Sequence, residues 1–234
     1  MRLSLGVREL ALVLSLACPS FAAQALDSAQ AAVSNAPAAQ PLAGTVEVLF
    51  SPWNDIEGAI LNALRNAKKT IYVQAFSFTS RELARGLIEA HKRGVKVMIL
   101  ADHEQTVKMD NSQIPALVKA GIPVALEMRY ASAHNKIMLI DADESEGLTQ
   151  GLTQGLNRGS NQGLVITGSY NFTYSAKARN AENIVILRSN PTVLQTYLYN
   201  WKRHHADALP YVEAALIPPK SRQGKSRAFS RKFE

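Results

Sequence analysis

Cysteine is almost absent from this chain of 234 residues, which limits the chemistry that the protein can use. The single cysteine, Cys18, lies in an N-terminal segment that has the features of a removable signal. If that segment is cleaved off, the mature chain can form no disulfide bond and contains no thiol nucleophile. The nucleophile of a catalytic site must then be another side chain.

Long hydrophobic runs are absent as well. The most apolar stretch, residues 10–17, is too short to span a bilayer. It follows two arginines and precedes small residues that offer a cleavage site at Ala25, which is the pattern of an export signal. We therefore predict that residues 1–25 are a signal peptide, and that the mature protein is secreted across the inner membrane of a bacterium into the periplasm.

Acidic side chains are scarce near the C-terminus. Residues 26–201 contain 16 basic and 15 acidic side chains, whereas residues 202–234 contain eight basic and only three acidic ones. Most of the net charge of +7 therefore lies in this segment. We predict a basic, disordered tail over residues 208–234, whose expected partner is a polyanion such as nucleic acid. The alternative interpretation is that the tail only increases solubility, because a solvated tail has the same composition.

Between these ends, the hydrophobic pattern predicts one α/β domain over residues 45–207. Residues 26–44 are rich in Ala, Gln, Pro and Ser and are expected to form a flexible leader. In the domain, strand-like runs alternate with segments of helical spacing. The predicted strands cover residues 46–50, 71–76, 95–101 and 122–126, and the predicted helices cover 56–67, 80–91 and 114–120. This alternation predicts helices layered on a sheet.

The alternation stops at residue 136. Strand-like segments at 136–140 and 164–167 follow each other without a helical pattern between them, so they should pair as an antiparallel hairpin. The hairpin makes the sheet mixed, and the predicted fold is a layered α/β/α sandwich. Residues 142–163, which repeat Gly-Leu-Thr-Gln, form the turn and are interpreted as a low-complexity insertion.

The predicted hairpin places reactive residues at one of its ends. Because the strands are antiparallel, His134 and Lys136 at the start of the first strand lie close to Ser169 and Asn171 after the second. Asp141 lies at the turn end, about 23 Å from His134 along the strand. We expect Asp141 to end the strand by hydrogen-bonding the turn backbone. The insertion then lies far from the reactive residues and has no role in the site. It is tolerated because the entropic cost of closing a loop rises only slowly with its length.

This cluster suits attack on a phosphodiester. The neutral imidazole of His134 can act as the nucleophile, and Lys136 on the same face of the strand supplies fixed positive charge. Ser169 and Asn171 can donate hydrogen bonds to phosphoryl oxygens. Glu182 can accept a hydrogen bond from the other imidazole nitrogen and so fix the tautomer. No cluster of metal-ligand type lies near these residues in the sequence, and we predict neither a metal ion nor another cofactor.

Two segments, HNKIMLID at 134–141 and GSYN at 168–171, match the motif of the phospholipase D superfamily, and the chain resembles that superfamily over residues 45–206. The stretches AFSFTS, HKRGVKVMIL, AGIPV, TGSYNFT and NAENIVIL are similar to those of its small, single-motif bacterial endonucleases. The turn departs from the family pattern, because 26 residues separate Asp141 from Gly168 where the family has a short turn.

The resemblance implies a role for each residue of the cluster. It makes His134 the nucleophile that forms a phosphohistidine, and it makes Glu182 the partner of a histidine. It makes Lys136, Ser169 and Asn171 phosphate-binding residues. It also implies activity without a divalent metal ion.

A phosphohistidine mechanism needs a second group, which first protonates the leaving oxygen and then activates water. The chain has one His-x-Lys motif, so the simplest source of this group is the same histidine of a second copy across a two-fold axis. We therefore predict a homodimer with one composite site at its interface, as the family resemblance also implies.

The predicted function is that of an exported endonuclease that cleaves DNA, RNA or both. Cleavage should be largely nonspecific, because phosphate contacts carry no base information. Two alternatives remain open. The same chemistry could hydrolyse phospholipid headgroups, and the basic tail would suit an anionic membrane surface. Alternatively, the protein could bind nucleic acid through its tail without catalysis, which would leave the cluster around His134 unexplained.

The chain has four other histidines, His91, His103, His204 and His205. We expect the first two to be surface residues. The last two lie at the end of a predicted helix, where they complement its dipole. Trp53 and Phe76 are expected in the core, with the lining of a substrate cleft as the alternative.

Overall fold

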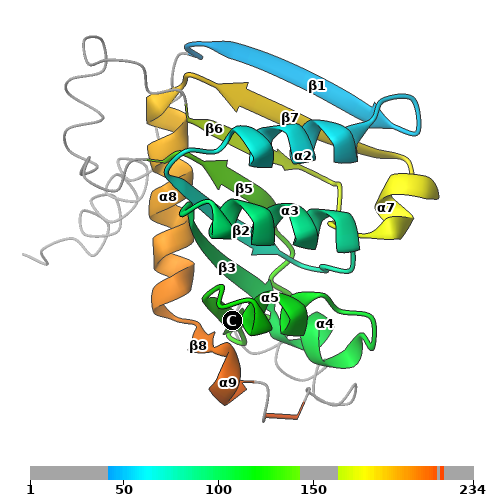
Figure 1. Ribbon diagram of the computed structural model, residues 1–234, viewed down its shortest axis with the longest axis vertical. Helices are drawn as coiled ribbons and strands as arrows, with labels where there is room; N and C mark the ends of the chain where they lie inside the picture. Colours follow the sequence, from blue (N-terminus) through cyan, green and yellow to red (C-terminus); the bar gives the residue numbers. More distant parts are fainter. Residues whose placement is uncertain (1–41, 143–162, 215–216, 219–234) are drawn as a thin grey trace, which may run out of the picture. The chain divides into compact units, whose positions relative to one another are not determined.

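The computed structural model describes residues 42–142, 163–214 and 217–218 (Figure 1). The predicted signal peptide lies outside the described residues, as do nearly all of the leader, the repetitive part of the insertion and most of the basic tail. In the described part of the chain, no helix is both long enough and apolar enough to cross a membrane.

An eight-stranded mixed sheet forms the centre of the described fold. Its strands are β1 (Thr45–Ser51), β2 (Thr70–Ala75), β3 (Lys96–Asp102), β4 (Val124–Glu127), β5 (Lys136–Ile140), β6 (Leu164–Gly168), β7 (Glu182–Arg188) and β8 (Leu209–Pro210). They lie side by side in the order β1-β7-β6-β5-β2-β3-β4-β8. Strand β3 pairs in parallel with β2 and β4, and the other neighbouring pairs are antiparallel. The predicted mixed sheet is confirmed.

Helices pack on both faces of this sheet. They are α2 (Ile56–Asn66), α3 (Arg81–Lys92), α4 (His103–Lys108), α5 (Ile114–Lys119), α7 (Tyr174–Ala178), α8 (Pro191–Ala206) and α9 (Tyr211–Ala214). Helices α2 and α3 run side by side across the strands (Figure 1) and share the larger core with α5. Apolar side chains of α8 pack with the opposite face in a second core. This is the layered α/β/α sandwich that the sequence predicted.

Local sequence explains where these elements form. Ser80 is the N-cap of α3, and its Oγ accepts a hydrogen bond from Leu83 N at 3.2 Å. Leu83, Leu87 and Ala90 follow helical spacing and are fully buried against the sheet. Strand β5 is buried along its whole length, as its central position and the apolar run of residues 137–140 require, and its first residue, Lys136, is a buried charge.

The predicted hairpin is confirmed. Strands β5 and β6 pair antiparallel, with Ile137 opposite Thr167 and Ile140 opposite Leu164. The start of β5 therefore lies beside the end of β6. Ile140 and Leu164 lie at the opposite edge of the sheet, and residues 143–162 of the segment that connects them are outside the described residues.

Asp141 has a structural role among the described residues, whereas a bond from it to the backbone of residues 143–162 stays a prediction. The Asp141 carboxylate accepts hydrogen bonds from the backbone nitrogens of Lys68, Lys69 and Thr70, at 2.9, 2.6 and 3.3 Å, in the connection between α2 and β2. Asp141 adopts the left-handed conformation, with φ of 53°, which aspartate tolerates better than most residues. It therefore joins the end of β5 to the segment that leads into β2.

We expect Asp141→Ala to lower the free energy of unfolding by about 1–3 kcal/mol, because it leaves three backbone donors without their acceptor. Asp141→Asn keeps one acceptor oxygen and the tolerance for positive φ, and it should lose less. Urea unfolding monitored by circular dichroism measures both values. Turnover at saturating substrate should stay at the wild-type level, and its collapse in a stably folded Asp141→Ala protein would contradict a purely structural role.

Candidate active site

The predicted site residues gather at one edge of the sheet. At this edge β1, β2, β3, β4 and β6 end, whereas β5 and β7 begin. Ala75 at the end of β2 is paired with Lys136, and Ser51 at the end of β1 is paired with Glu182. The loops that follow these strand ends carry the remaining site residues. Tertiary pairing thus brings together four segments that are distant in sequence.

His134 and Lys136 are in direct contact at this edge. The imidazole is exposed, whereas the lysine side chain is buried. Lys136 Nζ lies 2.8 Å from His134 Nδ1 and donates a hydrogen bond to His134 O at 2.7 Å. Phe76 packs beneath both residues, with its ring centroid 4.3 Å from that of His134 and 4.9 Å from Lys136 Nζ. The half-buried Phe76 therefore lines the site, as the alternative interpretation from the sequence proposed.

The burial of Lys136 changes its acid–base behaviour. Burial disfavours the charged ammonium and lowers the pKa of Lys136 from its ordinary value, and the nearby Glu182 carboxylate only partly opposes this effect. The ammonium is therefore a charge held in place by the fold, and it loses its proton more readily than an exposed lysine does.

Glu182 orients Ser169 in this chain, and its role as the partner of a histidine stays a prediction. Ser169 Oγ donates to Glu182 Oε2 at 2.5 Å and accepts from Asn183 N at 3.0 Å. The other carboxylate oxygen of Glu182 accepts from Asn180 Nδ2 at 2.8 Å. The backbone nitrogen of Glu182 donates to Ser51 Oγ at 3.1 Å, so β1 also helps to position Glu182.

The loop after β6 needs glycine at its first position. A Cβ atom on Gly168 would lie 2.2 Å from Asn183 O, and no side chain could be accommodated there. Asn171 and Tyr170 follow, and Asn171 Oδ1 and the Tyr170 hydroxyl are buried without a hydrogen-bond partner among the described residues. Burial raises the pKa of Tyr170, and the negative charge of Glu57 adds to this effect. Tyr170 is therefore neutral at physiological pH, and its ring packs in the larger core.

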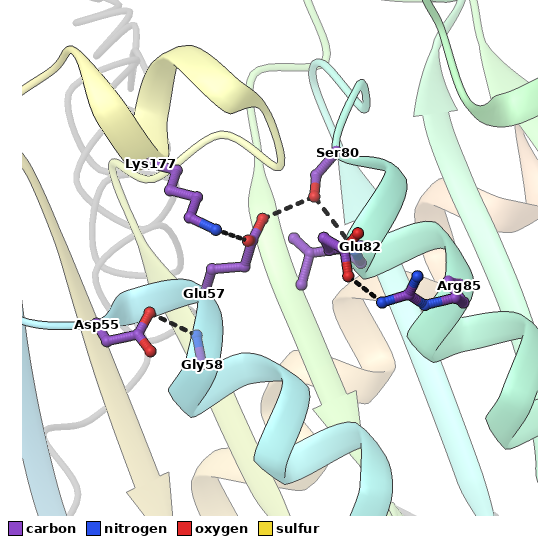
Figure 2. A network of polar contacts seen from close by, with 8 residues as sticks. Asp55, Glu57, Gly58, Ser80, Glu82, Arg85 and Lys177 are labelled. Atoms are coloured by element: carbon purple, nitrogen blue, oxygen red, sulfur yellow. Dashed lines mark hydrogen bonds and ion pairs between the residues drawn. The ribbon is translucent and has the colours of Figure 1, made fainter.

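A buried carboxylate supports this loop from behind (Figure 2). Glu57 on α2 accepts hydrogen bonds from Ser80 Oγ at 2.7 Å and from Lys177 Nζ at 2.6 Å. The bond to Glu57 raises the pKa of Lys177, so the lysine stays charged at neutral pH. Backbone nitrogens of Thr79 and Ser80 both donate to Phe172 O at 2.9 Å. Helices α2, α3 and α7 are thereby tied to the loop that carries the serine and asparagine of the motif.

The segment that carries His134 is held by an aspartate that sequence reasoning did not identify. Asp102, at the end of β3, accepts hydrogen bonds from Ala133 N and from Gln105 N, both at 2.8 Å. The second bond caps α4, and the first fixes the residue before the histidine. An aspartate between a strand and a helix is a signal for an N-cap, but its bond across to the next loop is visible only in the fold.

Two expectations outside the motif were wrong. His103 is buried, not a surface residue, and its Nε2 lies 3.0 Å from the carbonyl oxygens of both Ala214 and Ile217. Trp53 is 80% exposed and does not belong to the core. It follows Ser51 in the loop after β1, so it lies on the Glu182 side of the site.

A comparison with protein families decides the assignment of this site. The family model described as cardiolipin synthase, PLD-like domain, matches residues 60–203, which include the His-x-Lys and Gly-Ser-x-Asn segments. The chain belongs to the phospholipase D family. It is therefore a phosphodiesterase of the phospholipase D superfamily, as predicted from the sequence motif.

Relatives of this phospholipase D-family chain carry two different names. A protein of Rickettsia felis named phospholipase D is 33% identical over 165 residues, which are 70% of this chain and 72% of the relative. A Danio rerio protein named mitochondrial cardiolipin hydrolase is 30% identical over 170 residues, which are 71% of this chain and 63% of the relative. Both names state lipid substrates for those proteins.

Solved structures share the fold of this family member. A phospholipase D family member from Salmonella typhimurium, Nuc, superimposes with a TM-score of 0.59 at 27% identity, over 71% of this chain and 97% of that chain. NucT from Helicobacter pylori has a TM-score of 0.58 at 18% identity, over 71% and 98% of the two chains, and supports the fold alone. The predicted superfamily and fold are thus confirmed.

The lowered pKa of Lys136 predicts an alkaline fall in activity. A lysine that binds phosphate must be protonated, so kcat/KM should decrease as the pH rises through this pKa, at a lower pH than for an exposed lysine. Lys136→Arg keeps its charge throughout this range. It should abolish the alkaline fall and, because the new side chain is misplaced, reduce activity at neutral pH by ~10²-fold.

A pH profile of kcat/KM for the wild type, Lys136→Arg and Lys92→Arg checks this prediction. Lys92 lies on α3 and its side chain is 66% exposed, so its variant should follow the wild-type profile. The same alkaline fall in Lys136→Arg as in the wild type would show that another group titrates.

Proposed function

We propose that this phosphodiesterase is an exported endonuclease that cleaves DNA, RNA or both through a phosphohistidine on His134. The observation that carries this proposal is an exposed imidazole in contact with the buried ammonium of Lys136, at an edge where Ser169 is oriented by Glu182. The similarity to Nuc and the basic C-terminal segment support nucleic acid as the substrate.

The proposed reaction has two displacements at phosphorus. First, Nε2 of His134 attacks, the bond to the leaving oxygen breaks, and that oxygen takes up a proton. Water then attacks the phosphohistidine, transfers its proton to a base and releases the imidazole. Lys136 and Ser169 stabilise the charge on the phosphoryl oxygens in both steps. Neither step makes use of a metal ion or cofactor.

Substrate phosphate also sets the tautomer in this proposal. Attack through Nε2 needs the proton of the neutral ring on Nδ1. In the free chain Nδ1 faces Lys136 Nζ at 2.8 Å. A phosphate group is a stronger acceptor for the ammonium than an imidazole is, so its binding turns Lys136 away from Nδ1 and allows the reactive tautomer.

A homodimer completes the proposed site. The leaving oxygen needs an acid, and the second displacement needs a base. We propose that His134 of a second copy serves as both. Phe50 and Trp53 are 49% and 80% exposed beside Ser51 and Glu182, which supports an apolar contact on this side of the site.

Phospholipid is the second candidate substrate. The names of the Rickettsia and Danio relatives favour it, because the same two displacements cleave the phosphodiester of a lipid headgroup. The choice between nuclease and lipase therefore depends on groups around the site and not on the nucleophile.

His134→Ala should lower turnover by at least ~10³-fold, because it removes the nucleophile itself. The wild type should cleave plasmid DNA or RNA in excess EDTA and leave vesicles of anionic phospholipid intact. His91→Ala is the matched control, since His91 lies at the far end of α3. Gel and headgroup-release assays in parallel measure both activities. Cleavage of vesicles alone would establish the lipase, and loss of activity with EDTA would refute the metal-independent mechanism.

A composite site also predicts the behaviour of mixed dimers. Wild-type and His134→Ala chains with different affinity tags can be co-expressed and the heterodimer isolated by two purification steps. The heterodimer should have less than ~1% of the wild-type activity, because the one composite site needs the histidines of both copies. The heterodimer with His91→Ala is the control and should be fully active. Half of the wild-type activity in the first heterodimer would show two independent sites and contradict the proposal.

A further inference from the structure

A second concave region lies beside the proposed active site. It is a cavity of about 580 Å³ lined by Arg129, Tyr130, Arg203, His204, Ala206 and Asp207. Tyr130 belongs to the loop between β4 and β5 and precedes the catalytic His134 by only four residues. Strand β4 ends at the same edge of the sheet as β2, so Arg129 and Tyr130, which follow β4, lie toward the edge that carries the site.

A buried carboxylate anchors His204, which lines this cavity. Glu127, at the end of β4, is 4% exposed and accepts hydrogen bonds from His204 Nδ1 and from Gln74 Nε2, the latter at 2.9 Å. His204 thus has a buried partner, in addition to its predicted place at a helix end. The ring of Tyr130 packs on that of His204, with centroids 5.2 Å apart, and remains 42% exposed. An aromatic face is therefore held in a fixed position toward solvent.

Two arginines and one aspartate line the cavity together with this aromatic face. Arg129 pairs with the exposed Asp207, whereas Arg203 has no carboxylate partner among the described residues and lies over the ring of Tyr199, 5.8 Å from its centroid. A guanidinium group next to an accessible aromatic ring is the combination that binds a phosphate and a stacked base together. The face of a base is accessible in a single strand, but it is covered by its neighbours in a duplex.

We propose that this cavity binds a nucleotide of single-stranded nucleic acid next to the scissile phosphate, with the base on Tyr130 and its phosphate on Arg203. The inference rests on the proposed nuclease function and adds a preference for single strands. A lipid headgroup would use the arginine but would have no use for the tyrosine face.

Binding of a fluorescein-labelled 12-mer of DNA, as single strand and as duplex, tests this inference. All proteins carry His134→Ala so that the probe stays intact, and fluorescence anisotropy at physiological salt measures the Kd. Tyr130→Ala should weaken single-strand binding by about 5- to 150-fold, the loss expected for one stacked base. Tyr130→Phe should retain the affinity, and Arg203→Gln should weaken it.

Arg85→Gln controls for the loss of one positive charge, because Arg85 is an exposed residue of α3 paired with Glu82. It should bind as tightly as the parent. Unchanged binding in Tyr130→Ala, or an equal loss for the duplex, would overturn the inference. The proposed function is judged separately, by whether the protein with His134 intact cleaves the same 12-mers. Binding without cleavage would refute the nuclease and leave the nucleotide site standing.

Discussion

The antiparallel pairing of β5 with β6 inside the sheet is the constraint on which the site depends. Both strands have neighbours on either side, and β5 is buried along its whole length. A shift by one residue would turn each buried side chain to the opposite face, so the register is strongly determined. The register in turn places Lys136 next to the Gly-Ser-x-Asn loop. The chemistry of the family thus rests on backbone hydrogen bonds in the centre of the fold.

Buried charges connect the loops around this edge. Lys136, Glu57, Asp102 and Glu127 are each less than 10% exposed, and each has at least two hydrogen-bond partners. A buried charge without such partners would be strongly destabilising. Glu57, Asp102 and Glu127 each join segments that are far apart in sequence, whereas both bonds of Lys136 go to His134. They hold the site in place before substrate arrives, which is the condition for electrostatic stabilisation of a transition state.

The proposed nucleophile, His134, and Lys136 do not decide the substrate. A phosphohistidine can form on a nucleic acid or on a lipid, because the reacting group is the same phosphodiester. Selectivity must come from neighbouring groups such as Trp53, exposed beside Glu182, and Tyr130, exposed before His134. These aromatic residues lie in loops, where family members can differ without disturbing the sheet.

The sequence by itself determined the layered α/β/α fold, the hairpin and the cluster of His134, Lys136, Ser169 and Asn171. These follow from local periodicity and from the rule that adjacent strands without a crossover pair antiparallel. Only the tertiary structure decided that Glu182 binds Ser169, that Asp141 holds the connection into β2, and that Trp53 is exposed. Each of these contacts depends on which strands and loops become neighbours across the sheet. A hydrogen bond between residues that are distant in sequence produces no periodic pattern, so it could not be predicted from the sequence.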